Sequence, residues 1–161
     1  MRAGGDVVKR TFSVVVTMAL VVAFVSATDA YAAKKPTVIT VNLSEFTIAP
    51  LPSAEAKAGT VRMKVTNKGT LTHEMVLVRA ASETVLPKVT AAGGERKVGA
   101  VDEEAIPEKD KVGETGDVKA GKTVTKTFKL RPGKYVMFCN IDDANENHFS
   151  KGMSMGFVVT K

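Results

Sequence analysis

Hydrophobic and polar residues alternate in several short stretches of this chain, a pattern typical of β-strands with one buried face. In the first stretch, Ile39, Val41 and Leu43 share one face and polar or exposed positions occupy the other. The same period of two recurs in the stretches 61–66, 123–130 and 154–159. The apolar run 135–138 is uninterrupted, which predicts a central strand covered on both faces.

Turn-forming residues separate these stretches. Pro50 and Pro52 cannot donate a backbone hydrogen bond, so we expect 50–58 to be a surface connection rather than a strand. The tripeptide Arg131-Pro132-Gly133 has the composition of a tight turn. It predicts a hairpin that joins the strand 123–130 to the strand that follows.

Residues 80–121 show no sustained period, and we expect a long inserted loop at one edge of the sheet, with a short helix or hairpin inside it. About seven or eight short strands and this insertion predict an all-β chain. The expected architecture is an antiparallel Greek-key β-sandwich, formed by residues 33–161 as one domain.

The first 32 residues have the pattern of a signal peptide. Arg2, Lys9 and Arg10 precede the apolar run 11–27, and Ala30-Tyr31-Ala32 has the form of a cleavage site. The sequence therefore predicts export to the periplasm or the cell exterior. Because the run is almost as long as the roughly 20 residues of a membrane-spanning helix, an uncleaved anchor is the alternative interpretation.

Composition narrows the function classes further. The net charge of the 161 residues is +6, and the lysines are interleaved with acidic residues rather than clustered, which argues against nucleic acid as a partner. The chain has one cysteine and two histidines. In an oxidising compartment a lone cysteine is buried, reactive, paired between chains or bound to a metal.

The cysteine and histidines stand in a pattern that favours metal binding. Cys139 ends the uninterrupted strand, His148 and Met153 follow before the last strand, and His73 follows the turn 67–69. Thiolate and thioether sulfur select Cu(I), and imidazole accepts either oxidation state of copper. A buried structural thiol and a satisfied core histidine are the alternatives.

Four segments resemble the cupredoxins, and within them the small secreted plastocyanin-like and azurin-like copper proteins. They are Asn-x-Gly-x-x-x-His-Glu at 67–74, Tyr-x-x-x-Cys-Asn at 135–140, His-Phe-x-x-Gly-Met at 148–153 and the closing Phe-Val-Val at 157–159. The resemblance implies one copper ion with His73, Cys139 and His148 as equatorial ligands and Met153 as a weak axial ligand.

Two features of the ligand set stay open. Met155 is an alternative to Met153 as axial ligand, although it is expected to alternate into the core with the last strand. Met75 is a further candidate for the axial position. Eight residues separate Cys139 from His148, more than the family usually has. The extra residues could bulge outward or loosen the site.

The resemblance implies an exported mononuclear blue (type 1) copper protein that carries single electrons, with His148 as the exposed edge through which they pass. Its expected partners are redox proteins such as c-type cytochromes or membrane redox complexes. We expect a monomer that contacts a membrane only if the N-terminal segment is retained.

The alternative is a periplasmic copper carrier or scavenger that binds Cu(I) with the same ligands. An enzyme is disfavoured, because both histidines are used as ligands and none is left for a catalytic copper. A cysteine-histidine hydrolase is also disfavoured, since no oxyanion site can be identified.

Overall fold

The computed structural model describes residues 35–92, 94, 96–144 and 146–161. The predicted signal peptide, residues 1–32, lies outside the described residues. Among the residues that are described, no helix is both long enough and apolar enough to cross a membrane.

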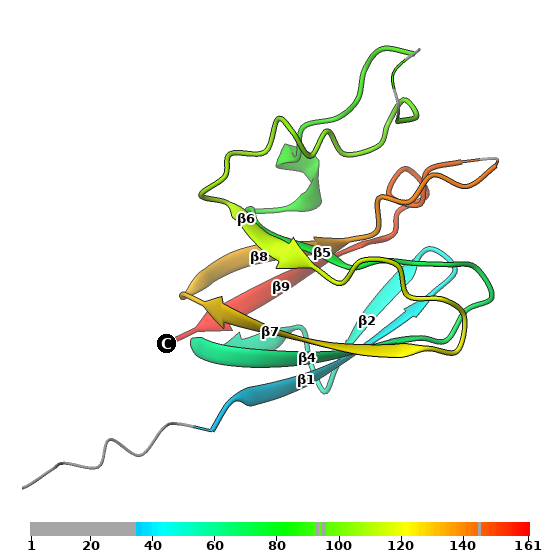
Figure 1. The fold of residues 1–161 in the computed structure, drawn as a ribbon. Coiled ribbons are helices and arrows are strands. Elements are labelled where there is room, and N and C mark those ends of the chain that lie inside the picture. Colours follow the sequence, from blue (N-terminus) through cyan, green and yellow to red (C-terminus); the bar gives the residue numbers. More distant parts are fainter. Residues whose placement is uncertain (1–34, 93, 95, 145) are drawn as a thin grey trace, which may run out of the picture. The chain divides into compact units, whose positions relative to one another are not determined.

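The described residues form a β-sandwich of two sheets (Figure 1), as the alternating pattern predicted. The strands are β1 (Thr37–Ser44), β2 (Thr47–Leu51), β3 (Glu55–Lys57), β4 (Gly59–Asn67), β5 (Val76–Arg79), β6 (Lys111–Glu114), β7 (Thr123–Leu130), β8 (Gly133–Phe138) and β9 (Ser154–Thr160). The strand order is β2-β1-β4-β7 in one sheet and β3-β9-β8-β5-β6 in the other. Both sheets are mixed rather than purely antiparallel, because β1 pairs with β4 and β3 with β9 in parallel.

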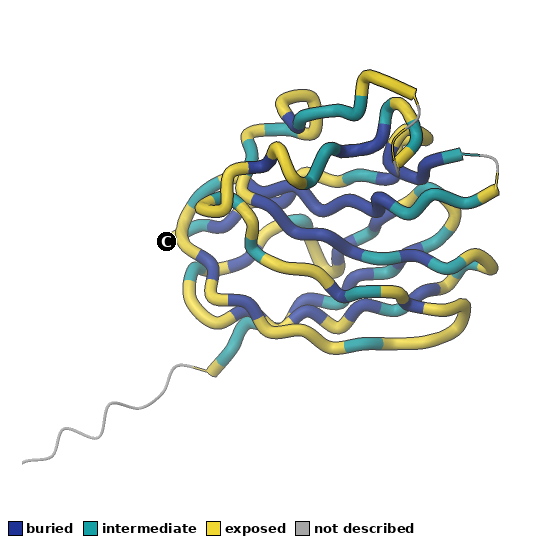
Figure 2. The backbone as a smooth tube through the Cα atoms, turned by 45° about the horizontal axis from the view of Figure 1, so that its top comes forward, coloured by how far each residue is buried: buried dark blue, intermediate teal, exposed yellow. Residues whose placement is uncertain are grey.

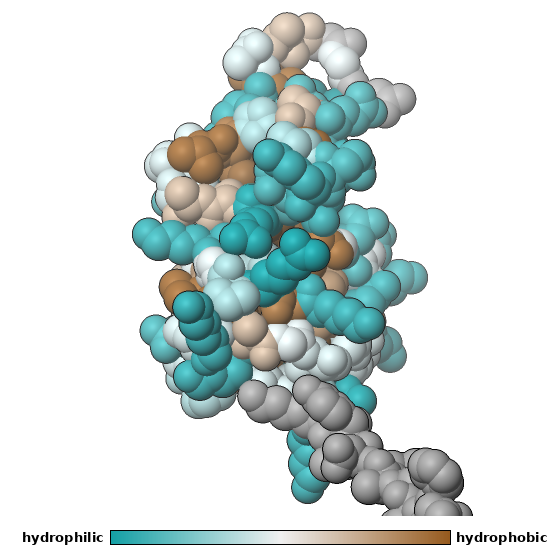
Figure 3. Space-filling view, turned by 90° about the vertical axis from the view of Figure 1, so that its left-hand side faces the viewer, coloured by the Kyte–Doolittle hydropathy of each residue, from teal (hydrophilic) through white to brown (hydrophobic). Residues whose placement is uncertain are grey.

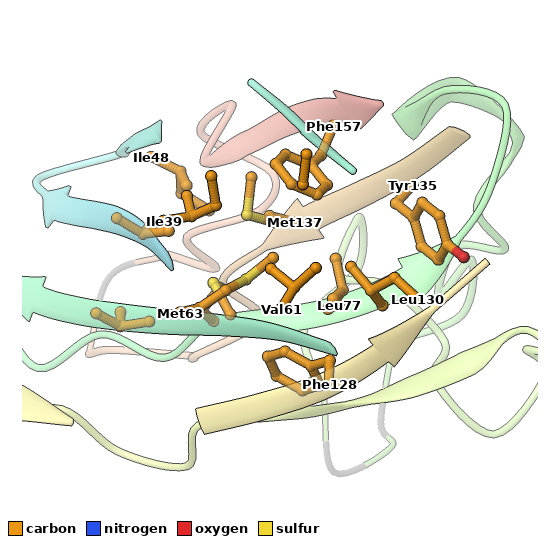
Figure 4. Packing of buried hydrophobic residues seen from close by; sticks show 14 of the residues in the cluster. Ile39, Ile48, Val61, Met63, Leu77, Phe128, Leu130, Tyr135, Met137 and Phe157 are labelled. Atoms are coloured by element: carbon orange, nitrogen blue, oxygen red, sulfur yellow. The ribbon is translucent and has the colours of Figure 1, made fainter. Parts of the chain in front are cut away.

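The main core lies between the two sheets, where the inward faces of the alternating strands meet (Figures 2 and 4). Ile39 and Leu43 of β1 and Val61 and Met63 of β4 are buried there, as their alternation predicted. Phe157 of β9 packs against them from the opposite sheet. Burial of these side chains is the main force that holds the two sheets together.

The strand β8 is covered on both faces, as its apolar run predicted. Tyr135 and Met137 face the main core, whereas Val136 and Phe138 belong to a second buried cluster. The insertion between β5 and β7 supplies the other side of that second cluster through Leu86, Val101 and Ile106. The insertion therefore covers the outer face of the sheet and also forms its edge, where its strand β6 pairs with β5. It also contains a 3₁₀ turn at Glu83–Val85.

Two of the turn predictions are wrong. Pro50 lies inside β2, opposite Val41, and this is possible because β2 is an edge strand whose outer side needs no partner. The turn 131–133 does not close a hairpin: β7 pairs with β4, while β8 pairs with β5 and β9. The turn instead carries the chain from one sheet to the other. The Tyr135 hydroxyl accepts the Arg131 N–H at 3.2 Å and donates to the Arg131 carbonyl at 2.8 Å, which holds this crossing in place.

The crossing lies at the end of the sandwich that Figure 3 shows, where hydrophilic side chains surround small hydrophobic patches. A cavity of about 550 Å³ at this end is lined by five basic residues, namely Arg79, Lys109, Lys111, Lys129 and Arg131. Within the described part of the chain, only Lys111 of these five forms an ion pair, with Glu108 at 2.5 Å. Part of the net positive charge of the chain is therefore gathered at this end.

Candidate metal centre

Four connections meet at the other end of the sandwich. They are the β1–β2 turn, the loop between β4 and β5, the segment that precedes β7 and the loop between β8 and β9, all toward the right of Figure 1. His73 lies in the second of these connections, and Cys139, His148 and Met153 lie in the fourth. The fold thus brings the predicted ligands from two distant parts of the sequence to one end.

Asn67 shapes the loop that carries His73. The buried Asn67 side chain donates from Nδ2 to the carbonyls of Leu71 and Val118, both at 2.7 Å, and its Oδ1 accepts the Gly69 N–H at 2.9 Å. The His73 backbone then pairs with Val118 in both directions, at 3.2 and 2.7 Å. Because this loop satisfies its own backbone groups, it holds the buried His73 in a defined place.

The other loop starts at Cys139, directly after β8, and ends at Met153, directly before β9. The Cys139 N–H donates to the Met153 carbonyl at 3.1 Å, and the Met153 N–H donates to the His148 carbonyl at the same distance. The His148 N–H donates to the Ile141 carbonyl at 2.9 Å. The described part of this long loop therefore holds His148 beside Cys139.

Three of the four predicted ligands converge. The Nδ1 atoms of His73 and His148 lie 3.1 Å apart, and the Cys139 Sγ lies 3.4 Å from the His148 Nδ1. The ligand atoms of all three residues lie within 4.8 Å of one another, and all three residues are 0 % exposed. The lone pairs of two ring nitrogens and a sulfur this close repel one another unless a proton or a cation lies between them.

The surroundings of the sulfur fit a bound cation. The Glu74 N–H donates to the Cys139 Sγ at 3.4 Å, and the Asn140 N–H donates to the Glu74 Oε1 at 3.0 Å. Burial raises the pKa of the Cys139 thiol to about 11. Burial also lowers the pKa of His73, and the neighbouring His148 adds to this effect. A neutral imidazole can bind a metal ion directly. The thiol binds as a thiolate, after it has lost its proton to solvent.

Glu74 is a further polar group at the centre. Burial raises the pKa of its carboxyl group to about 7, and the charges of Glu103 and Glu114 act in the same direction. Its position next to His73 and its hydrogen bond to Asn140 connect the two ligand loops.

The methionines differ in burial. Met153 and Met75 are both fully buried in the main core, whereas Met155 is 37 % exposed and does not follow the inward alternation that we expected of it. The backbone of Met153 is bonded to Cys139 and His148. Met153 as axial ligand stays a prediction, and its burial beside the two ligands agrees with it.

The expectation that His148 forms an exposed edge is wrong. Its side chain is completely buried, because Phe46 and Asp143 cover the ring. The Phe46 ring meets the His148 ring edge-on, with centroids 5.5 Å apart, and the Asp143 Oδ2 lies 3.4 Å from the His148 Nε2. Phe46 has a φ of 57°, an unusual value for a residue other than glycine, so the β1–β2 turn holds it in a strained conformation.

No signal in the sequence pointed to Glu45, whose carboxylate connects the β1–β2 turn to the His73 loop. Its carboxylate accepts the N–H groups of Thr70 and Leu71 and the Thr70 hydroxyl. These bonds, with that from the Thr70 N–H the largest, lower the pKa of Glu45 to about 2. An acidic residue in a turn is common, so only the folded structure identifies this one as an anchor.

We expect Glu45→Gln to lower the stability of the metal-free protein slightly at pH 7, and by much less at pH 2. Because the pKa is lower in the folded state than the ordinary 4.5, the carboxylate contributes its full stability above about pH 4.5 and loses it as the pH falls through 2. Urea unfolding of both proteins from pH 7 to pH 2 measures the difference. A difference that stays constant over this range would contradict the role of the charge.

No protein-family model matches the sequence, and no curated protein matches it either. Solved structures do match. The dithionite-reduced auracyanin from the photosynthetic bacterium Roseiflexus castenholzii is 21% identical with a TM-score of 0.53, over 80% of this chain and 100% of that one. Auracyanin B is 20% identical with a TM-score of 0.54, over 80% and 92% of the two chains. Rusticyanin from Thiobacillus ferrooxidans is 14% identical with a TM-score of 0.50, over 78% and 79%.

These proteins are cupredoxins, so this chain has the cupredoxin fold that its sequence motifs predicted. The likeness shows the fold, and the chemistry of the centre rests on the side chains described above.

Proposed function

We propose that this chain binds one copper ion through His73, Cys139 and His148, with Met153 as a weak axial ligand, and carries single electrons. The observation that supports this most is the meeting of two imidazole Nδ1 atoms and one thiol sulfur within 4.8 Å, all fully buried. A His2Cys set with a distant thioether is typical of electron-transfer copper sites.

Bound copper supplies a one-electron couple between Cu(I) and Cu(II). The protein contributes rigidity: the Cys139 and His148 backbones are linked through hydrogen bonds to Met153, and the His73 backbone is bonded to Val118 in both directions. Ligands held in this way change position little when the charge of the centre changes, which favours fast transfer. The Glu74 N–H at the Cys139 sulfur stabilises the thiolate and so adjusts the potential.

The residues that could support other chemistry also favour an electron carrier over an enzyme. Both of its histidines turn toward the same centre, which leaves none for a separate catalytic site. A hydrolase needs a thiolate nucleophile, whereas burial raises the pKa of Cys139 to about 11. The similar auracyanin is known in a dithionite-reduced form, and we assign a reducible centre to this chain as well.

Partners and location belong to the same proposal. A signal peptide at residues 1–32 would deliver the domain to the periplasm or the cell exterior. There it would exchange electrons with redox proteins such as c-type cytochromes or membrane redox complexes.

The direct test is to add Cu(II) to the purified protein and record its visible spectrum. We expect an intense thiolate-to-copper absorption band at one equivalent of copper. A spectrum no stronger than that of copper bound to ordinary surface groups would contradict the proposal.

A second measurement separates an electron carrier from a copper carrier. Because all three ligands are fully buried, we expect a Cu(I) chelator to strip the metal slowly while electron exchange is fast. Rapid stripping together with slow electron exchange would instead support the copper carrier.

A further inference from the structure

The His148 ring lies between two different groups, one at each nitrogen. Its Nδ1 faces the sulfur of Cys139 and the Nδ1 of His73, and its Nε2 faces the Oδ2 of Asp143 at 3.4 Å. A carboxylate can only accept a hydrogen bond, so this contact requires the proton of a neutral His148 to be on Nε2. The Nδ1 lone pair is then free to bind a metal ion.

The contacts of the His73 ring agree with a proton on the His148 Nε2. If His148 Nδ1 carries no proton, the His73 Nδ1 at 3.1 Å must donate to it, and the His73 Nε2 is then a bare acceptor. Among the described residues, the buried His73 Nε2 has no hydrogen-bond partner. A buried acceptor without a partner is less unfavourable than a buried N–H without one.

The two carboxylate oxygens of Asp143 contact different groups. Oδ1 accepts the Glu146 N–H at 2.9 Å and closes a turn in which the Asp143 N–H donates to the Glu146 carbonyl at 3.0 Å. The other oxygen, Oδ2, lies 3.4 Å from the His148 Nε2. The turn therefore helps to orient the carboxylate toward His148.

The insertion between β5 and β7 fixes this turn from outside. The Lys97 Nζ donates to the Asp143 carbonyl at 2.6 Å, and the Lys97 N–H donates to the Asp142 Oδ2 at 3.3 Å. Asn147 directly precedes His148, and its Nδ2 donates a hydrogen bond to the Asp142 Oδ1 at 3.0 Å. Asp143 is thus supported by residues from two parts of the chain.

From these contacts we infer that Asp143 is a positioning residue for His148: it fixes the proton on Nε2 and keeps Nδ1 directed at the metal site. The residues between Cys139 and His148 then serve to place this carboxylate. This inference rests on the proposed function for its use of the metal, but the protonation state of His148 can be measured without any metal.

The test uses Asp143→Asn with Glu146→Gln as a matched control. In Asp143→Asn the amide oxygen can still accept the Glu146 N–H and keep the turn, so an NH₂ group replaces Oδ2 opposite His148. A donor there favours the proton on Nδ1. Glu146→Gln removes one negative charge from the same loop, but Glu146 pairs with Lys151 and not with His148.

In the metal-free protein, ¹⁵N NMR of the imidazole shows which nitrogen carries the proton. We expect Nε2 in the wild type and in Glu146→Gln, and a shift toward Nδ1 in Asp143→Asn. In the copper-loaded proteins, we expect a Cu(I) chelator to strip Asp143→Asn roughly 10-fold faster than the wild type, the lower end of the usual effect of removing such a partner. The control should be stripped at the wild-type rate.

The inference is overturned if wild-type His148 carries its proton on Nδ1, or if Asp143→Asn matches the wild type in both measurements. Equal effects of the two substitutions would also overturn it, because a general charge effect would then explain the result. If the wild type binds no copper, the proposed function fails, while the NMR result still decides the role of Asp143.

Discussion

Cys139→Ser is expected to abolish the intense absorption of the copper-loaded protein and to leave the fold intact. The absorption requires a thiolate bound to copper, and a serine hydroxyl supplies neither a soft ligand nor a group that loses its proton readily. Serine is close to cysteine in size, and the Glu74 N–H that now donates to Sγ can donate to its hydroxyl oxygen. We expect a loss of stability of about 1 kcal/mol in the metal-free protein, because a hydroxyl replaces a thiol in a fully buried place.

The visible spectrum and urea unfolding of the variant measure these two effects. Met155→Leu is the matched control, because Met155 carries sulfur near the same loop but is more than a third exposed. The control should keep the full band. A band that survives in Cys139→Ser would show that the absorption does not arise from this thiolate, and the proposed centre would be wrong.

The sequence could predict strands with one buried face from their alternation, and it could predict β8, which is buried on both faces, from its apolar run. Val61, Met63 and Val65 of β4 repeat a period of two because one face meets the core and the other meets water. The insertion has no such period, since it contributes single side chains such as Leu86 and Ile106 to a cluster built on β8. Contacts that are widely spaced in the sequence leave no local pattern. The packing of the insertion on the outer face of the sheet could therefore not be predicted.

The same distinction applies to the candidate metal centre. His73, Cys139 and His148 could be named as candidate ligands because each lies in a short motif of its own. Their surroundings could not be predicted, since they depend on contacts between distant segments. The burial of His148 under Phe46 is such a case: a strained turn about 100 residues earlier in the chain provides the cover, and nothing in the sequence of either segment indicates it.

Asn140 is one of the residues that join the insertion to the candidate metal centre. It follows Cys139, it is fully buried, and its side chain bonds to Val101 in both directions: the Val101 N–H donates to Oδ1 and Nδ2 donates to the Val101 carbonyl, each at 2.9 Å. Nδ2 also donates to the Glu103 Oε1 at 2.7 Å. The Asn140 carbonyl accepts the Arg96 Nη1 at 2.6 Å.

We expect Asn140→Ala to destabilise the metal-free protein by about 3 kcal/mol, because the buried N–H and carbonyl of Val101 both lose their partner and each costs roughly 1–3 kcal/mol. Urea unfolding measures the loss, and amide hydrogen exchange of Val101 shows whether the insertion opens locally. Glu103→Gln is the control: it keeps the pair between Asn140 and Val101, and it removes the charge of a partly exposed carboxylate that accepts from Asn140 and pairs with Arg96 at 3.4 Å. If the control is destabilised as much as Asn140→Ala, the bonds to Val101 do not hold the insertion on β8, and the contact with Glu103 must do so instead.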